Sequence, residues 1–210
     1  MSLLHFYALH GGETLGLLGE HLLLVGVSTI AAVGIGVPLG IFLTRRPAWR
    51  GPVLGVANVL QTIPSLALFG LLIPLPLIGG IGARTAIVAL IVYALLPIIR
   101  NTYAGITGVE PAVREAGRGM GMTDGELLRR VELPLAAGVI LAGIRVATVI
   151  GVGVATIAAA VGAGGLGVYI FRGVATVDDT LILAGALPAA LLALAVDALF
   201  GALERRTAWR

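Results

Sequence analysis

The sequence predicts an all-α membrane protein with five transmembrane helices, and three observations support this fold class. Hydrophobic residues make up 58% of the 210 residues and charged residues only 12%, about half the ~25% charged residues of a soluble domain. The mean hydropathy is +1.04. The apolar residues also gather into runs of about 20, the length that a helix needs to cross a bilayer. Little sequence remains for a separate soluble catalytic domain.

Five apolar runs are interpreted as the transmembrane helices. They cover roughly residues 21–44, 53–74, 85–99, 135–161 and 180–203. Together with their connections they predict a single transmembrane domain over residues 21–206. Residues 1–20 are moderately apolar and contain no Lys or Arg, whereas a signal peptide begins with basic residues. We therefore expect residues 1–20 to form an N-terminal interfacial segment.

The arginines predict how the helices are oriented in the membrane. If the N-terminus lies outside and the C-terminus inside, only Arg84 and Arg172 fall on the outer side. Cytoplasmic loops of membrane proteins carry an excess of basic residues, so this orientation is favoured. Eleven of the fourteen basic residues then lie on the cytoplasmic side, namely Arg45, Arg46, Arg50, Arg100, Arg114, Arg118, Arg129, Arg130, Arg205, Arg206 and Arg210.

Residues 110–134 form the one long charged segment, between the third and fourth spans, and the orientation predicts that it is cytoplasmic. Pro111 can open a short helix, because proline suits the first helical turn. Thr123 and Glu126 have the spacing of a capping box, in which each side chain bonds a backbone amide at a helix start. Two short helices at a membrane surface are suited to docking against another protein.

The second span carries polar residues at its centre. Gln61, Thr62 and Ser65 interrupt the apolar run around Pro64, and such groups usually face the bundle interior or an aqueous path. With Tyr93 of the third span, they are our candidates for a translocation path. A compatible alternative is a proline kink whose freed carbonyls bond Thr62 and Ser65. For Tyr93 the alternative is an aromatic ring packed between helices.

Arg145 is the one basic residue well inside a predicted span. It lies about eleven residues past Pro134, or about 16 Å along a helix. An unpaired charge at that depth costs at least about 2.5–3.5 kcal/mol, so Arg145 needs partners or water. We expect a structural intramembrane charge that either reaches the cytoplasmic interface or is tied within the bundle. Carbonyls at Pro64 or Pro97, or an acidic residue of the charged segment, are the expected partners for such a tie.

Two patterns suggest a cofactor, and both are rejected. Residues 162–167 match GxGxxG, but this fingerprint binds dinucleotides only between a strand and a helix, and here it follows a membrane span. His5, His10 and His21 lack the spacing of a metal-ligand cluster, and the chain contains no Cys. No Lys is present either, so a phosphate-binding P-loop is impossible. We expect no metal and no cofactor in this chain.

The charged segment resembles the EAA loop of ABC importer permeases. The family pattern is EAA, three residues, G, nine residues, I, one residue and LP. Gly117 and Val131 depart from this pattern but keep its spacing. The resemblance implies a coupling loop over about residues 110–134 that contacts an ATPase subunit; an ordinary amphipathic loop is the alternative. The residues that match the family's coupling contact are Glu115, Ala116, Gly117, Gly121, Leu133 and Pro134.

Other strings resemble the osmoprotectant branch of this family, and the resemblance extends over roughly residues 21–206. It implies the type I ABC importer permease fold and a permease for quaternary amines such as glycine betaine, choline or carnitine. Methionine importers share parts of these strings, so another small solute is the alternative. The strings are residues 61–70, 93–97, 100–102, 140–145 and 162–167.

The same resemblance implies the partners and the mechanism. Two permease copies or paralogues would associate in the inner (plasma) membrane with two ABC ATPase subunits and an extracellular substrate-binding protein. The ATPase subunits would bind ATP and Mg and drive alternating access, so the chain itself would catalyse no reaction and bind no nucleic acid. Neither the carried amine nor the choice between identical and paralogous permeases follows from these residues.

The competing class is a secondary transporter or channel that works alone. Such proteins usually contain inverted repeats and intramembrane carboxylates or histidines. Five spans do not divide into equal halves, and Asp197 is the one acidic residue deep in a predicted span. A membrane scaffold without transport activity would leave the EAA spacing unexplained.

Overall fold

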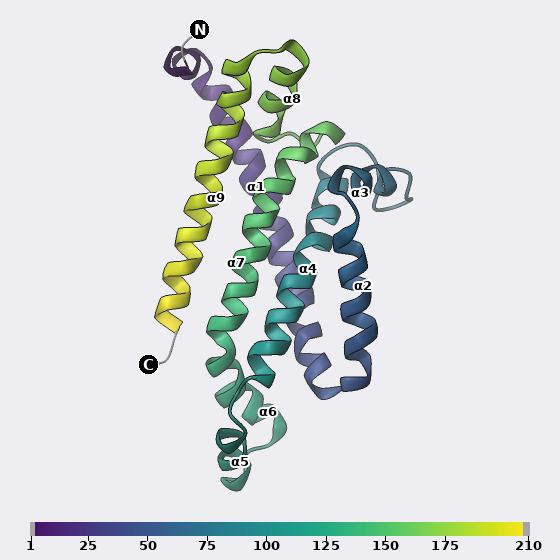
Figure 1. Cartoon of the computed structure of the whole chain (residues 1–210), viewed down its shortest axis with the longest axis vertical. Coiled ribbons are helices and arrows are strands. Elements are labelled where there is room, and N and C mark those ends of the chain that lie inside the picture. Colours follow the sequence, from purple (N-terminus) through teal and green to yellow (C-terminus); the bar gives the residue numbers. More distant parts are fainter. Residues whose placement is uncertain (1–2, 208–210) are drawn as a thin grey trace.

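The computed structural model describes residues 3–207, and every regular element in that range is helical (Figure 1). The predicted all-α class is therefore confirmed. η1 and η3 are 3₁₀-helices and η2 is a π-helix. In chain order the elements are α1 (Leu3–Arg45), η1 (Pro47–Trp49), α2 (Arg50–Thr62), α3 (Ser65–Leu72), α4 (Ala83–Thr107), α5 (Pro111–Gly119), α6 (Asp124–Leu127), η2 (Leu128–Glu132), α7 (Leu133–Ile157), η3 (Ala158–Val161), α8 (Gly167–Thr176) and α9 (Asp179–Thr207).

Four stretches of helix are long and apolar enough to cross a membrane: α1, α4, α9 and the stretch from Asp124 to Val161 that contains α7. A fifth span is obtained if α2 and α3 count as one broken helix, bent by 101° between them. Pro64 explains the break, because proline disfavours helical geometry at the preceding residue. Ile63 is accordingly extended, with φ −65° and ψ 126°. The predicted count of five corresponds to this bent pair plus the four long helices.

The first long helix begins earlier than the predicted span. α1 continues from residue 3 to residue 45, and non-helical torsions occur inside it at His10. Its first turns pack on the end of the bundle that carries α8, where the Phe6 and Tyr169 rings lie edge to face at 5.3 Å. The Tyr7 hydroxyl donates to the Ala184 carbonyl at 3.1 Å. The location of residues 1–20 at the membrane interface stays a prediction.

Two other boundaries differ from the prediction. α4 continues to Thr107, past the predicted end of the third span at residue 99, because Arg100 and Asn101 mark the edge of an apolar run without breaking a helix. The connection before the last span contains α8, which the prediction left without structure. Glycines at residues 162, 164 and 165 with positive φ separate α8 from η3.

α1, α4 and α7 form the centre of the bundle, and small residues let them approach closely. A Cβ atom on Gly40 of α1 would lie 2.6 Å from Thr102 Cβ of α4. One on Gly143 of α7 would lie 2.5 Å from Asn101 Cβ. Glycine at such positions suits membrane proteins, because close packing replaces the hydrophobic drive that lipid cannot supply.

The outside of the bundle is apolar. α9 is the least covered of the long helices, with Leu191, Leu194 and Leu199 each at least 60% exposed. Exposed leucines on this scale are unfavourable in water and suit a lipid environment. The surface therefore agrees with the membrane location predicted from composition.

Candidate coupling site

The charged segment forms a small helical unit that projects past one end of the bundle. Figure 1 shows α5 and α6 at the bottom of the molecule, beyond the ends of α4 and α7. We call residues 110–134 the charged loop and this end of the bundle the loop end. The predicted capping box is present: the Glu126 amide donates to Thr123 Oγ1 at 3.4 Å, and the Thr123 amide donates to Glu126 Oε2 at 3.0 Å.

Gly117 and Leu127 form the interior of the charged loop. Gly117 is buried, and a Cβ atom there would lie 2.7 Å from Leu127 Cδ1. Leu127 is itself fully buried. Glycine in place of the family's second alanine therefore lets α5 lie directly on α6. Gly117 thus contributes to packing within the charged loop.

The other matched residues lie around this interior. Glu115 and Ala116 are exposed on α5. Gly121 is exposed in the turn between α5 and α6, and its φ of +81° is a left-handed conformation that favours glycine. Leu133 and Pro134 are half-buried in the first turn of α7. A contact of these residues with an ATPase stays a prediction.

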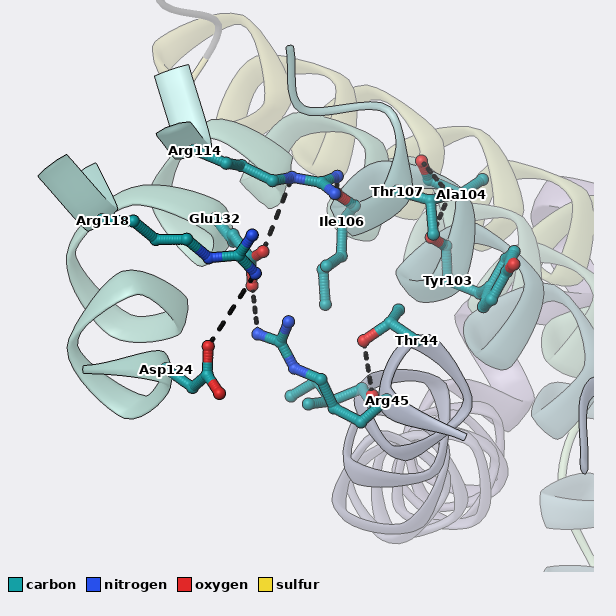
Figure 2. Close-up of polar contacts among 11 residues, drawn as sticks. Thr44, Arg45, Tyr103, Ala104, Ile106, Thr107, Arg114, Arg118, Asp124 and Glu132 are labelled. Carbon is teal, nitrogen blue, oxygen red and sulfur yellow. Dashed lines mark hydrogen bonds and ion pairs between the residues drawn. The ribbon is translucent and has the colours of Figure 1, made fainter. Parts of the chain in front are cut away.

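A buried carboxylate connects the charged loop to the bundle, and it was not among the predicted residues. Glu132, 1% exposed, accepts a hydrogen bond from Arg45 Nη2 at 2.5 Å and lies 3.6 Å from Arg114 Nε. Figure 2 shows the two arginine side chains approaching this carboxylate from different helices. The one feature of the sequence that indicates a buried acid here is that Glu132 lies between the apolar residues Val131 and Leu133.

The expected partners of Arg145 are wrong. Its Nε and Nη2 donate to the two carboxylate oxygens of Asp197 at 2.6 and 2.7 Å, and its Nη1 donates to Glu204 at 3.3 Å. Both acids lie on α9, which packs against α7, whereas the prediction named proline carbonyls or the charged loop. Gly201 makes room for the guanidinium, because a Cβ atom there would lie 3.2 Å from Arg145 Nη1. Arg145 therefore ties α7 to α9.

The four path candidates come together at the bend between α2 and α3. Thr62 is exposed there, and Gln61 and Ser65 are half-buried. Thr62 Oγ1 donates to the Val59 carbonyl at 2.7 Å. Tyr93 of α4 is only 7% exposed, and its hydroxyl donates to the Ile63 carbonyl just before Pro64. Thr62 and Tyr93 thus bond carbonyls near the kink, whereas the kink interpretation named Thr62 and Ser65 for these bonds. A role of the four residues in a path stays a prediction.

The glycine-rich stretch at residues 162–167 is a tight turn at the end of the bundle opposite the loop end. The Gly165 amide donates to the Glu20 carboxylate of α1 at 2.9 Å. No strand occurs among residues 3–207, so the strand and helix that a dinucleotide fingerprint requires are not both present there. Across the same described range, no three His, Asp or Glu side chains are grouped as metal ligands.

The family of the chain follows from a comparison with known proteins. Residues 36–209 match the family described as the binding-protein-dependent transport system inner membrane component. The chain therefore belongs to this family of multi-pass inner-membrane permeases, the class that the helical bundle and the charged loop define.

Its relatives extend over nearly the whole chain. The osmoprotectant import permease protein OsmW of Salmonella typhimurium is 47% identical, covering 97% of this chain and 96% of the relative. The choline transport system permease protein OpuBB of Bacillus subtilis is 45% identical over 97% of this chain and 93% of the relative. The glycine betaine/carnitine/choline permease OpuCB of the same organism is 44% identical over 98% and 93%. The predicted resemblance to the osmoprotectant branch is confirmed.

Solved structures show the same architecture. The MetNI methionine ABC transporter in inward-facing conformations gives a TM-score of 0.81 at 26% identity, covering 90% of this chain and 94% of that chain. An amino acid ABC transporter solved with histidines gives 0.75 at 22% identity, covering 98% and 99%. The type I ABC importer permease fold predicted from sequence is therefore confirmed.

Proposed function

We propose that this chain is the membrane-spanning subunit of an ATP-driven importer for quaternary-amine osmoprotectants such as glycine betaine, choline or carnitine. One observation carries the substrate class: relatives named for these solutes are 44–47% identical and cover at least 97% of this chain. The methionine transporter is only 26% identical. Because that transporter shares the fold but is less similar in sequence, methionine is only the second candidate solute.

The charged loop is proposed as the contact with a separate ATPase subunit, which binds ATP and Mg. Exposed Glu115 and Ala116 on α5, and exposed Gly121 in the following turn, offer a compact surface at the loop end. A carboxylate such as Glu115 can accept a charge-assisted hydrogen bond from a basic partner. Small residues beside it would let the ATPase approach the backbone.

The transporter is proposed to contain two permeases, two ATPase subunits and an extracellular binding protein. The loop end faces the cytoplasm in this arrangement, because the basic residues gather there. ATP binding would draw the ATPase subunits together and move the charged loops with them. The bundles would then alternate between outward and inward access, past the bend that carries Gln61, Thr62 and Ser65.

Affinity purification of the tagged chain from its native membranes tests this proposal. The expected result is co-purification of an ABC ATPase subunit, together with ATP-dependent uptake of labelled glycine betaine, choline or carnitine by cells that express the complex. Methionine is the matched control solute. A chain that purifies without any ATPase and transports alone would contradict the proposal, as would uptake of methionine but of none of the three amines.

A further inference from the structure

Glu132 is the one acidic side chain that is buried within residues 3–207. Its Oε2 accepts from Arg45 Nη2 at 2.5 Å, and its Oε1 lies 3.6 Å from Arg114 Nε. The two arginines are 36% and 26% exposed, so water reaches them but scarcely reaches the carboxylate. We call these three residues the Glu132 clamp.

The clamp joins four helical elements at one point. Arg45 is the last residue of α1, Arg114 lies on α5, and Glu132 directly precedes α7. Arg114 Nη2 also donates to the Ile106 carbonyl at 2.5 Å, in the last turn of α4 (Figure 2). Arg114 therefore adds a side-chain bond to a helix-end carbonyl that also accepts from the Val109 amide at 3.3 Å. Arg114 thus links α5 to α4 by a hydrogen bond and to Glu132 by an ion pair without a hydrogen bond, and Glu132 in turn holds the end of α1.

The clamp lies at an irregular turn within the continuous helical stretch Asp124–Val161. Between α6 and α7 the backbone forms a π-helix over Leu128–Glu132, in which the Leu133 amide bonds the Leu128 carbonyl. π-helical turns are rare and often mark functional sites. Such an irregular turn could bend and absorb a movement of the charged loop before it reached α7. The ion pairs of Glu132 connect α5 and the end of α1 directly to the start of α7, without passing through the rest of this turn.

A buried carboxylate paired with partly exposed arginines is weak evidence for a role in stability alone. Removing the Glu132 carboxylate from water costs much of the free energy that its attraction to the arginines returns, and an apolar residue of similar size often stabilises a protein as well or better. The best-attested use of such groups is to fix geometry. The arrangement around Glu132 fits that use, because each bond joins a different helix.

We propose that Glu132 is a positioning residue that makes the charged loop and the ends of α1, α4 and α7 move as one body. The inference rests on the proposed function, in which the ATPase moves the charged loop. With the clamp intact, a displacement of α5 is passed to the bundle. Without the clamp, the π-helical turn absorbs it, and ATP is hydrolysed without transport.

Transport per ATP hydrolysed is the first test, made on the complete complex in proteoliposomes. Glu132→Gln keeps the size of the side chain but removes its charge. We expect this variant to assemble and hydrolyse ATP while moving at least ten-fold fewer amine molecules per ATP. Glu132→Asp keeps the charge and should recover part of the loss. The matched control is Glu13→Gln, which breaks the exposed Glu13–Arg172 pair (3.2 Å) at the opposite end and should leave the ratio unchanged.

A role in stability alone predicts a different result. Less complex would then assemble, but each assembled complex would transport normally per ATP, and that outcome would overturn the proposal. Should Glu132→Gln fail to assemble, Arg45→Gln removes the same bond from the exposed side of the clamp. It is expected to lower the ratio as well, and an unchanged ratio in Arg45→Gln also overturns the proposal.

A distance measurement tests the clamp without any substrate. Spin labels at Ala112→Cys on α5 and Arg46→Cys beside the end of α1 occupy exposed positions in a chain without natural cysteine. With the clamp intact, the label distance should be the same in the nucleotide-free and ATP-trapped complexes. In Glu132→Gln it should broaden or shift on trapping. A shift in the intact complex contradicts the clamp, whereas failure of amine uptake with an invariant distance contradicts only the proposed substrate class.

Discussion

Arg145 and Asp197 form a bidentate ion pair between α7 and α9, with Nε–Oδ1 and Nη2–Oδ2 distances of 2.6 and 2.7 Å. The planar fork of arginine matches a carboxylate in this way, and the ammonium group of lysine does not. α9 is otherwise the least covered long helix. The pair therefore adds a specific polar contact to the packing of α9 against α7.

Arg145→Lys is expected to keep the charge but lose one of the two parallel bonds. The complex should still assemble with its ATPase, while the midpoint of thermal unfolding falls slightly, because one hydrogen bond of a partly exposed ion pair is lost. Amine uptake should also fall, because α9 is then held less firmly against α7. Thermal unfolding and uptake measure the two effects, with the exposed Arg205→Lys on α9 as control. Normal stability and normal uptake in Arg145→Lys would show that the fork is not needed.

Gly121→Trp tests the proposed ATPase contact. The turn that holds Gly121 is exposed, so the ring should leave the membrane bundle folded but prevent close approach of the ATPase. Substrate-stimulated ATP hydrolysis should therefore be abolished. Gly121→Asn is the matched control, because asparagine tolerates the left-handed backbone and adds little bulk. Full transport by a well-expressed Gly121→Trp protein would remove this turn from the contact.

Cysteine labelling tests the proposed path. Cysteines placed singly at Gln61, Thr62 and Ser65 should react with a water-soluble thiol reagent in at least one nucleotide state, because a path fills with water as it opens. Leu66→Cys, next to Ser65 and 58% exposed on an apolar surface, is the control and should stay unreactive in every state. Protection of all three path positions in every state would mean that they are buried between helices.

Gly40→Ala tests the close packing of α1 on α4. The added methyl would lie 2.6 Å from Thr102 Cβ and 3.1 Å from the Ile99 carbonyl oxygen. Overpacking of this kind costs about 1–3 kcal/mol, so the midpoint of thermal unfolding should fall. Gly34→Ala on the same helix is the control, since nothing lies within 4 Å of its added methyl. An equal effect of the two substitutions would contradict the close helix contact.

The sequence predicted local features well. The capping box at Thr123 depends on residues three apart, and the break at Pro64 depends on adjacent ones, so both follow from short-range stereochemistry. The apolar runs likewise located the spans to within a few residues at most of their ends. The exceptions, such as the early start of α1, occur where a helix continues beyond its apolar run.

Contacts between distant residues were not predictable in this way. Arg145 and Asp197 are 52 positions apart, and Arg45 and Glu132 are 87 apart. Which side chains meet across two helices depends on how each helix is rotated about its axis, and the rotation is set by packing of the whole bundle. Glu132 also falls at the one unspecified position before Leu133-Pro134, so the family pattern gave no reason to select it.

ATP-driven uptake in proteoliposomes tests the central claim most directly. The purified permease and ATPase subunits are reconstituted with the binding protein outside and ATP inside, and labelled glycine betaine, choline and carnitine are offered in turn. We predict accumulation of at least one of these amines against its gradient, dependent on ATP and on the binding protein, with no accumulation of methionine. Amine uptake that proceeds equally without ATP, or its complete absence in a complex that accumulates methionine, would contradict the account.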